Sequence, residues 1–346
     1  MRILAIILSL AWVLTVPVSA MDFTAPAAPE QAQKYLPDET EDFGEGLRFV
    51  IKSALETVQP SIMEALGVCV SLVIAAMLVG LISEIPGNVK TNVELVGTVT
   101  AGVLLFRPAN SLIRLGIDII RQISQYGKLL LPVMTGALAA QGSATKSGAI
   151  YAATAFFDAL ISHTVSELLV PLVYILLCIS VACNLFQQPL LKDMRKFIKW
   201  LLTWSLKTIL YVFTGYISIT GVVGGATDAT MLKAAKLTIS GMVPVVGSIL
   251  SDASEAVLVS AGLMKNAVGV YGLLVMISLW IGPFLQIGIQ YLMLKASSGI
   301  CEMFGTKEVA ELMKDFSSAM GLVLAMIGTV CLIFIISTIC FMKGVS

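Results

Sequence analysis

Charged residues are scarce in this chain. Lys, Arg, Asp and Glu make up 13% of its 346 residues, whereas 57% are apolar. Soluble domains typically carry about 25% charged residues, so charge cannot cover the surface of a water-soluble protein of this size. The 22 basic residues balance the 22 acidic ones. This balance argues against a nucleic-acid partner, because such partners favour a basic face.

The chain also lacks the residues that metal, disulfide and catalytic sites need. A single histidine, His163, excludes a His-rich metal site. None of the six cysteines forms a CxxC pair, and most lie in apolar runs, where cysteine behaves as a small buried hydrophobe. The sequence contains no GxSxG, HExxH, Walker A or GxGxxG motif. We therefore expect neither an enzyme nor a metal or cofactor.

The N-terminus has the three parts of a secretory signal peptide. Arg2 supplies the positive region, residues 3–16 supply the apolar region, and Val18-Ser19-Ala20 is a small-residue cleavage signal. The pattern predicts a signal peptide over residues 1–20, and an uncleaved first anchor is the alternative.

An acidic stretch separates this signal from the rest of the chain. Residues 21–45 contain seven acidic residues, one lysine and three prolines. We interpret them as a poorly ordered extracytoplasmic arm. Residues 46–346 then form a helical membrane domain, which begins with a predicted amphipathic helix over 46–64 that Pro60 kinks or breaks.

Apolar runs long enough to cross a bilayer recur through this domain, since a span needs about 20 apolar residues. The longer runs are 67–83, 168–186, 200–223, 268–294 and 319–341. Shorter runs occupy 95–106, 129–140, 148–162 and 242–250. We predict an all-α polytopic membrane protein with about 5–8 membrane-embedded helical segments. Re-entrant hairpins and amphipathic interfacial helices, such as residues 302–317, are candidates among them.

The distribution of basic residues predicts the topology, because lysine and arginine are enriched in cytoplasmic loops. Loops at 187–199 and 295–318 are assigned to the cytoplasm on this basis. The basic stretch 107–128 should also be cytoplasmic, which requires that residues 95–106 do not cross. Its basic residues are Arg107, Arg114, Arg121 and Lys128.

Two short apolar segments resemble each other and indicate a weak internal repeat. Residues 131–138, with Pro132 and Gly136, parallel residues 243–250, with Pro244 and Gly247. Such Pro/Gly-interrupted segments in matching positions point to a duplicated, transporter-like fold. Chance similarity between apolar stretches is the alternative.

The second of these segments is the main candidate for a polar pathway. We expect Pro244 and Gly247 to shape a non-helical turn at membrane depth, where protein or water must satisfy the backbone. Asp252 would cap the following helix or accept a hydrogen bond from Lys265. The candidate pathway residues here are Pro244, Gly247, Ser251, Asp252, Lys265 and Asn266. Pro132 and Gly136 of the first segment are candidates for the same re-entrant or pathway role.

Asp158 and Lys207 are candidate intramembrane charges. A charge at the centre of a span costs about 2.5–3.5 kcal/mol on insertion scales. Each could therefore belong to a polar pathway or an internal ion pair. The alternative is a side chain that extends to the membrane interface.

One block of the sequence resembles a known family. Residues 230–272 read TMLKAAKLTISGMVPVVGSILSDASEAVLVSAGLMKNAVGVYG. This block is similar to the stage III sporulation protein AE family of endospore-forming bacteria, and VPVVGSILSDA followed by LMKNAVG is its more specific part. The block LLLPVMTGALAAQGSATKSGAIY at 129–151 fits more loosely. The likeness covers most of residues 60–345.

The resemblance implies a multi-pass protein of the mother-cell membrane that surrounds the forespore. It implies membership of a channel complex, similar in part to secretion systems, that sporulation requires. The implied partners are other membrane proteins of the stage III sporulation A operon, a forespore membrane partner and the lipid bilayer. The N-terminal arm is short for the family, so no role of a longer extracytoplasmic region carries over. The alternative function is a stand-alone permease that moves a small solute.

Overall fold

The computed structural model describes residues 24–37, 43–83, 89–140, 144–242, 247–304 and 306–343. Side chains are described within these ranges except at 83–92, 218–266 and 343. The described residues are almost entirely helical and contain no strand, which confirms the all-α fold class. The helices are α2 (Glu30–Gln33), α3 (Phe43–Thr57), α4 (Gln59–Ser83), α5 (Val89–Ala140), α6 (Ala144–Thr164), the π-helix η1 (Val165–Leu169), α7 (Val170–Phe186), α8 (Pro189–Met242), α9 (Gly247–Met303) and α10 (Lys307–Lys343).

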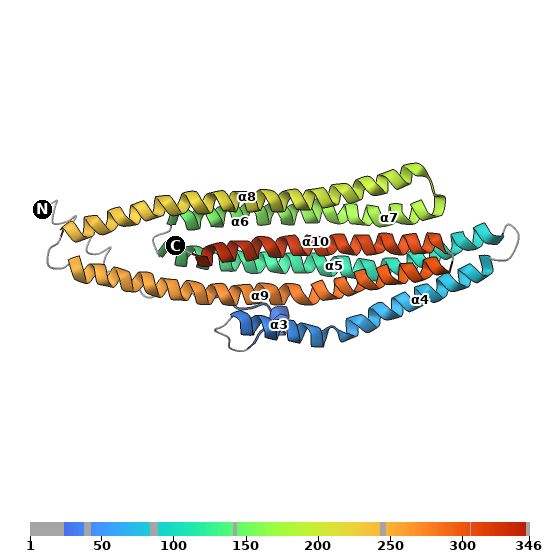
Figure 1. Ribbon diagram of the computed structural model, residues 1–346, viewed down its shortest axis with the longest axis horizontal. Helices are drawn as coiled ribbons and strands as arrows, with labels where there is room; N and C mark the ends of the chain where they lie inside the picture. The colour runs from blue at the N-terminus through green and yellow to red at the C-terminus, as the bar shows by residue number, and fades with distance from the viewer. Residues whose placement is uncertain are drawn as a thin grey trace.

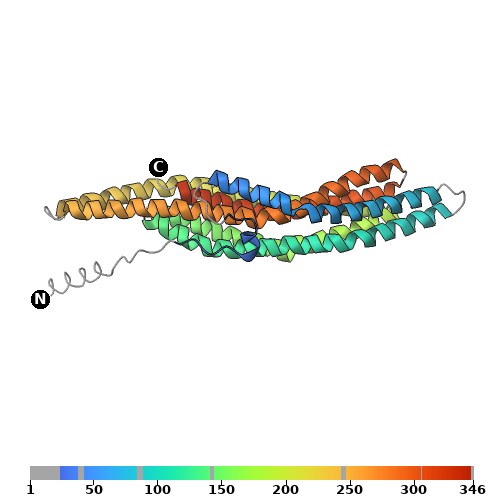
Figure 2. The same cartoon turned by 90° about the horizontal axis from the view of Figure 1, so that it is seen from below.

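The helices lie along one long axis and form an elongated bundle (Figure 1). Three of them, α5, α8 and α9, contain 52, 54 and 57 residues. At 1.5 Å per residue these helices are about 78–86 Å long, more than twice the roughly 30 Å of a bilayer's hydrocarbon core. The end of α8 and the start of α9 run side by side beyond the other helices in both views (Figures 1 and 2). Parts of the long helices must therefore lie outside any bilayer that they cross.

Four helical stretches in the described part of the chain are long and apolar enough to span a membrane. They are Gln59–Ile82, Ala144–Phe186, Ala267–Met303 and Lys307–Met342. They contain or closely match four of the longer predicted runs. The fifth run, 200–223, belongs to α8, whose side chains are described only as far as Ile217. A span in α8 therefore stays a prediction.

Helix α5 packs closely against α9 and α10 at three glycines. A methyl group on Gly116 would meet Val323 of α10, and one on Gly127 would meet the ring of Phe334. Gly272 of α9 approaches Leu130 in the same way. Small residues allow such close helix approach in membrane bundles. These contacts place the C-terminal half of α5 at the same level as the apolar cores of α9 and α10.

The predicted loops are shorter in the structure than the sequence suggested. The loop expected at 187–199 is a two-residue turn, in which Gln187 has a left-handed φ of 50° and α8 then starts at Pro189. At 295–318, α9 continues to Met303 and α10 begins at Lys307, so most of the predicted amphipathic helix 302–317 is helical and belongs to α10. Arg195 and Lys199 of α8 pair with Asp315 of α10, so the basic composition of 189–199 reflects a helix contact and not a loop.

Part of the predicted disordered arm is folded. Residues 24–37 contain α2, and Ala28, Ala32 and Tyr35 are buried. The Tyr35 ring lies against Gly282 of α9. The expectation of disorder was wrong for this stretch, because its few apolar side chains cover α9. Residues 1–20, the predicted signal peptide, lie outside the described residues.

Two irregularities in the helices coincide with prolines. The turn at Val58, between α3 and α4, comes just before Pro60, in agreement with the predicted break. The π-turn η1 comes just before Pro171. Proline lacks an N–H and crowds the carbonyl one turn earlier, and a π-turn is one way to accommodate it. Helices continue through the other internal prolines, which are Pro108, Pro132 and Pro283.

Candidate functional site

The predicted re-entrant site falls mainly outside the described side chains. Pro244 lies between Met242, where α8 ends, and Gly247, where α9 begins, and it is not described. The remaining candidates share the first part of α9, where only the backbone is described and is helical. They are Gly247, Ser251, Asp252, Lys265 and Asn266. A turn and a polar pathway at this place stay predictions.

The matching segment in the first half of the chain is helical. Helix α5 continues through Pro132 and Gly136 to Ala140. The Thr135 hydroxyl donates to the Leu131 carbonyl oxygen at 2.7 Å, inside the same helix. Pro132 and Gly136 therefore form no re-entrant turn. Whether either belongs to a pathway, and whether the two segments are a repeat, stays a prediction.

Asp158 lies inside the bundle, between α6 and α5. Its side chain is 2% exposed, and the Ser124 hydroxyl of α5 donates to Asp158 Oδ2 at 2.7 Å. The Ser162 hydroxyl donates to Oδ1 at 3.5 Å. Lys207 differs, since it is exposed on α8 beside the buried Leu206. The structure thus places one predicted charge in a polar cluster of the interior and the other on the surface.

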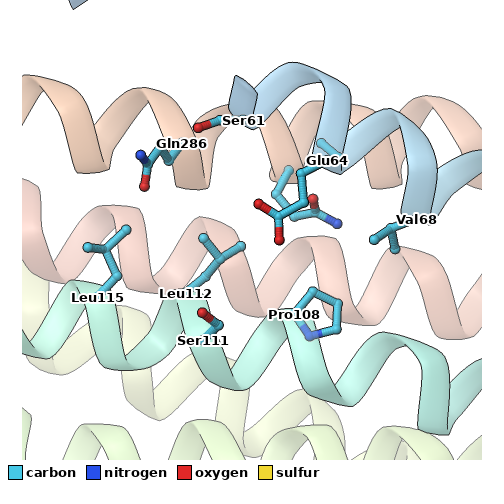
Figure 3. Close-up of a pocket in the computed structure, with 10 residues that line it drawn as sticks. Ser61, Glu64, Val68, Pro108, Ser111, Leu112, Leu115 and Gln286 are labelled. Carbon is cyan, nitrogen blue, oxygen red and sulfur yellow. The ribbon is translucent and has the colours of Figure 1, made fainter. Parts of the chain in front are cut away.

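A cavity of about 230 Å³ lies between α4, α5 and α9. Figure 3 shows Glu64 pointing from α4 into the space between α4 and α5. Pro108, Leu112 and Leu115 of α5 line the other side (Figure 3). The polar lining residues are Ser61, Glu64, Ser111, Gln286 and Gln290. Three helices far apart in the sequence therefore bring a carboxylate, two hydroxyls and two amides together.

The cavity offers hydrogen-bonding groups beside apolar helices, including two amides within one candidate span. Gln286 and Gln290 lie near the middle of the candidate span Ala267–Met303. Gln290 is 6% exposed, and its Nε2 has no hydrogen-bond partner in the described part of the chain. A buried amide without a partner costs about 1–3 kcal/mol, so it favours a bound acceptor. The arrangement can hold water or a small polar solute between helices.

The sequence does not predict this cavity, although it contains one signal of it. Gln286 and Gln290 are four residues apart in an apolar run, so they share one face of a helix. Glu64 and Ser111 lie in other helices, and no sequence spacing joins them to this pair. Helix packing alone assembles the lining.

A second polar cluster joins the N-terminal parts of α8 and α10. Asp315 is 5% exposed and pairs with Arg195 and, at 2.9 Å, with Lys199. Arg195 also lies 3.9 Å from Glu311. Burial lowers the pKa of Arg195, but the neighbouring Asp315 carboxylate outweighs burial, and the net pKa is raised. This cluster holds two helices together, and no group of three or more His, Cys, Asp or Glu suited to a metal occurs among the described residues.

Two comparisons with known proteins point to the same family. A family model described as Stage III sporulation protein AE matches residues 35–344. The chain is 22% identical over 238 residues to the Stage III sporulation protein AE of Bacillus subtilis (strain 168). The aligned region covers 68% of this chain and 60% of the relative. The chain therefore spans less than two thirds of that relative's length. No solved structure matches this chain significantly.

Proposed function

We propose that this chain, which belongs to the stage III sporulation protein AE family, is a membrane subunit of a channel complex between mother cell and forespore. The complex is secretion-like, and the chain lies in the mother-cell membrane around the forespore. Its partners are other membrane proteins of the stage III sporulation A operon and a protein of the forespore membrane. The family match and the four candidate spans support a role in sporulation at a membrane.

The polar cavity between α4, α5 and α9 is the observation that carries the channel role. Polar groups at membrane depth are unfavourable and mark pathways more often than anchors. Gln286 and Gln290 line the cavity near the middle of the candidate span Ala267–Met303, where a protein that only anchored others would need no polar side chain. Ligand sites of transport proteins also lie near the middle of the bilayer, between helices.

The length of α8 and α9 supports assembly with partners. Their paired ends project beyond the remaining helices (Figure 1). Such a projection can reach other subunits outside the hydrocarbon core, where a simple anchor would need no helix of 54 or 57 residues.

A stand-alone permease is the second candidate, because the cavity is built within one chain. The purified chain in liposomes distinguishes the two functions. A permease would move a solute without other proteins, whereas a subunit of a larger channel would not.

Deletion and complementation test the proposed function. Deleting the gene in its own organism should lower the yield of heat-resistant spores by orders of magnitude, and the wild-type gene should restore it. The double variant Gln286→Leu/Gln290→Leu, present at the same protein level, should restore a much smaller spore yield than the wild-type gene. Leu292→Ala changes an exposed residue of the same helix outside the cavity and should restore the full spore yield. Normal sporulation without the gene would contradict the proposal.

A further inference from the structure

Helix α5 carries a continuous polar stripe on its exposed face. Every exposed residue between Arg107 and Lys128 is polar, and the apolar residues Phe106 and Leu129 bound the stripe. The stripe consists of Arg107, Ser111, Arg114, Asp118, Arg121, Gln125 and Lys128. The spacing alternates between four and three residues, which keeps all seven side chains on one helix face.

The basic residues of this stripe recur every seventh position. Arg107, Arg114, Arg121 and Lys128 therefore form a ladder with steps of about 10.5 Å and a total rise of about 32 Å. This rise matches the roughly 30 Å hydrocarbon core of a bilayer. If the helix lay flat on a membrane, the length of its basic stripe would not need to equal the thickness of the hydrocarbon core.

The ladder lies beside apolar helices and not beyond them. Gly116 of α5 approaches Val323 of α10, and Gly127 approaches Phe334. Both partners belong to the candidate span Lys307–Met342, whose exposed residues at this level include Leu332 and Ile339. Figure 2 shows α5 along a long edge of the bundle. If α10 crosses the membrane, the α5 stripe crosses it at the same depth.

Lipid cannot cover this face. Each arginine or lysine facing lipid at the centre of a span costs about 2.5–3.5 kcal/mol on insertion scales. Arg121 has an ion-pair partner, Asp118 at 3.8 Å, but that pair is itself exposed. Arg107 and Arg114 have no carboxylate within ion-pair distance in the described part of the chain. Water must therefore reach the stripe, or protein must cover it.

We propose that the α5 stripe lines a water-filled conduit for small anions, an inference that rests on the proposed channel role. The stripe holds four positive charges and one negative charge, so it attracts anions and repels cations. Successive levels of lysine and arginine line anion-selective pores in the same way. Ser111 belongs both to the stripe and to the cavity described above, so the cavity opens on the conduit side of α5. Other subunits close the conduit, because one helix cannot enclose water.

Cysteine labelling in native membranes tests the conduit. Single cysteines replace Ser111, Arg114, Asp118 or Gln125 in a cysteine-free chain, and a membrane-impermeant, water-soluble thiol reagent is added from either side. These positions should react, whereas cysteines at the buried Ile113 and Ile120 and at the outward-facing Leu332 should not. Stripe positions as unreactive as Leu332→Cys would overturn the proposal, because lipid or protein would then cover them.

The charge of the reagent tests the preference for anions. At Ser111→Cys, an anionic sulfonate reagent should react several-fold faster than a cationic ammonium reagent of the same size. The double change Arg107→Gln/Arg114→Gln should remove most of that ratio, and the exposed pair Lys52→Gln/Lys196→Gln, on α3 and α8, should leave it unchanged. Equal or faster reaction with the cation would overturn anion preference. The labelling needs no sporulation phenotype, so its failure is distinguishable from failure of the proposed function.

Discussion

Single polar residues inside the bundle are held by specific partners from other helices. Asp158 accepts a hydrogen bond from Ser124 across α5 and α6, and Thr154 contacts Ser337 of α10 at 2.5 Å between hydroxyl oxygens. Each pair ties two helices together in a medium where water cannot replace the lost partner. These residues therefore fix the position of α6 relative to the central helices.

The Asp315 cluster gives a prediction at this scale. Asp315→Ala leaves Arg195, only 15% exposed, without its close carboxylate. We expect a loss of about 1.5–3 kcal/mol, the usual worth of a hydrogen bond to a charged group. Asp193→Ala is the matched control, since its pair with Lys196 is 76% exposed on both sides and such pairs contribute at most about 1 kcal/mol. Thermal unfolding in detergent measures the stability of both variants. Equal losses of stability would contradict the claim that the Asp315 cluster stabilises the contact between α8 and α10.

The packing of α5 against α10 gives a prediction at the scale of elements. Alanine normally stabilises a helix by about 0.5–1 kcal/mol relative to glycine. Gly127→Ala should nevertheless destabilise the protein by about 1–3 kcal/mol, because its methyl group would overlap the buried Phe334 ring. Gly328→Ala in α10 meets nothing within 4 Å and should be neutral or stabilising. A stabilised Gly127→Ala variant would show that the two helices are not in this contact.

The apolar elements were predictable from the sequence because their signal is local. Runs such as 268–294 and 319–341 exceed the length of a span, and the structure places them in α9 and α10. The polar helical segments were not predictable in the same way. The basic composition predicts a cytoplasmic loop at 187–199, yet residues 189–199 belong to α8. The basic stretch 107–128, which the sequence assigns to the cytoplasm, lies within the long helix α5.

The candidate sites also divide into features with a local sequence signal and features that depend on helix packing. The sequence marks Asp158 as a charge in an apolar run and leaves open whether it is buried or reaches the membrane interface; the structure buries it. The cavity around Gln290 depends on how α4, α5 and α9 pack, which no window of sequence contains. The α5 stripe did have a sequence signal, the seven-residue recurrence of Arg107, Arg114, Arg121 and Lys128. The sequence alone indicates a charge bias there, and the packing of α5 beside the candidate span of α10 is what supports the proposal that these residues lie at the depth of a span.

The whole molecule combines a membrane-embedded bundle with a long projection. The central helices carry the cavity and the polar stripe, while the ends of α8 and α9 extend beyond them (Figures 1 and 2). A channel subunit needs both features, one to line a path and one to reach its neighbours. A stand-alone permease needs only the first.

The composition of the native assembly tests the central claim most directly. Membranes from sporulating cells are cross-linked and solubilised, and a tagged copy of this chain is isolated for mass determination and protein identification. We predict a large assembly that contains other membrane proteins of the same sporulation stage in fixed ratio. A tagged chain isolated alone at the mass of a single copy would contradict the account, provided that the same cross-linking captures a known complex.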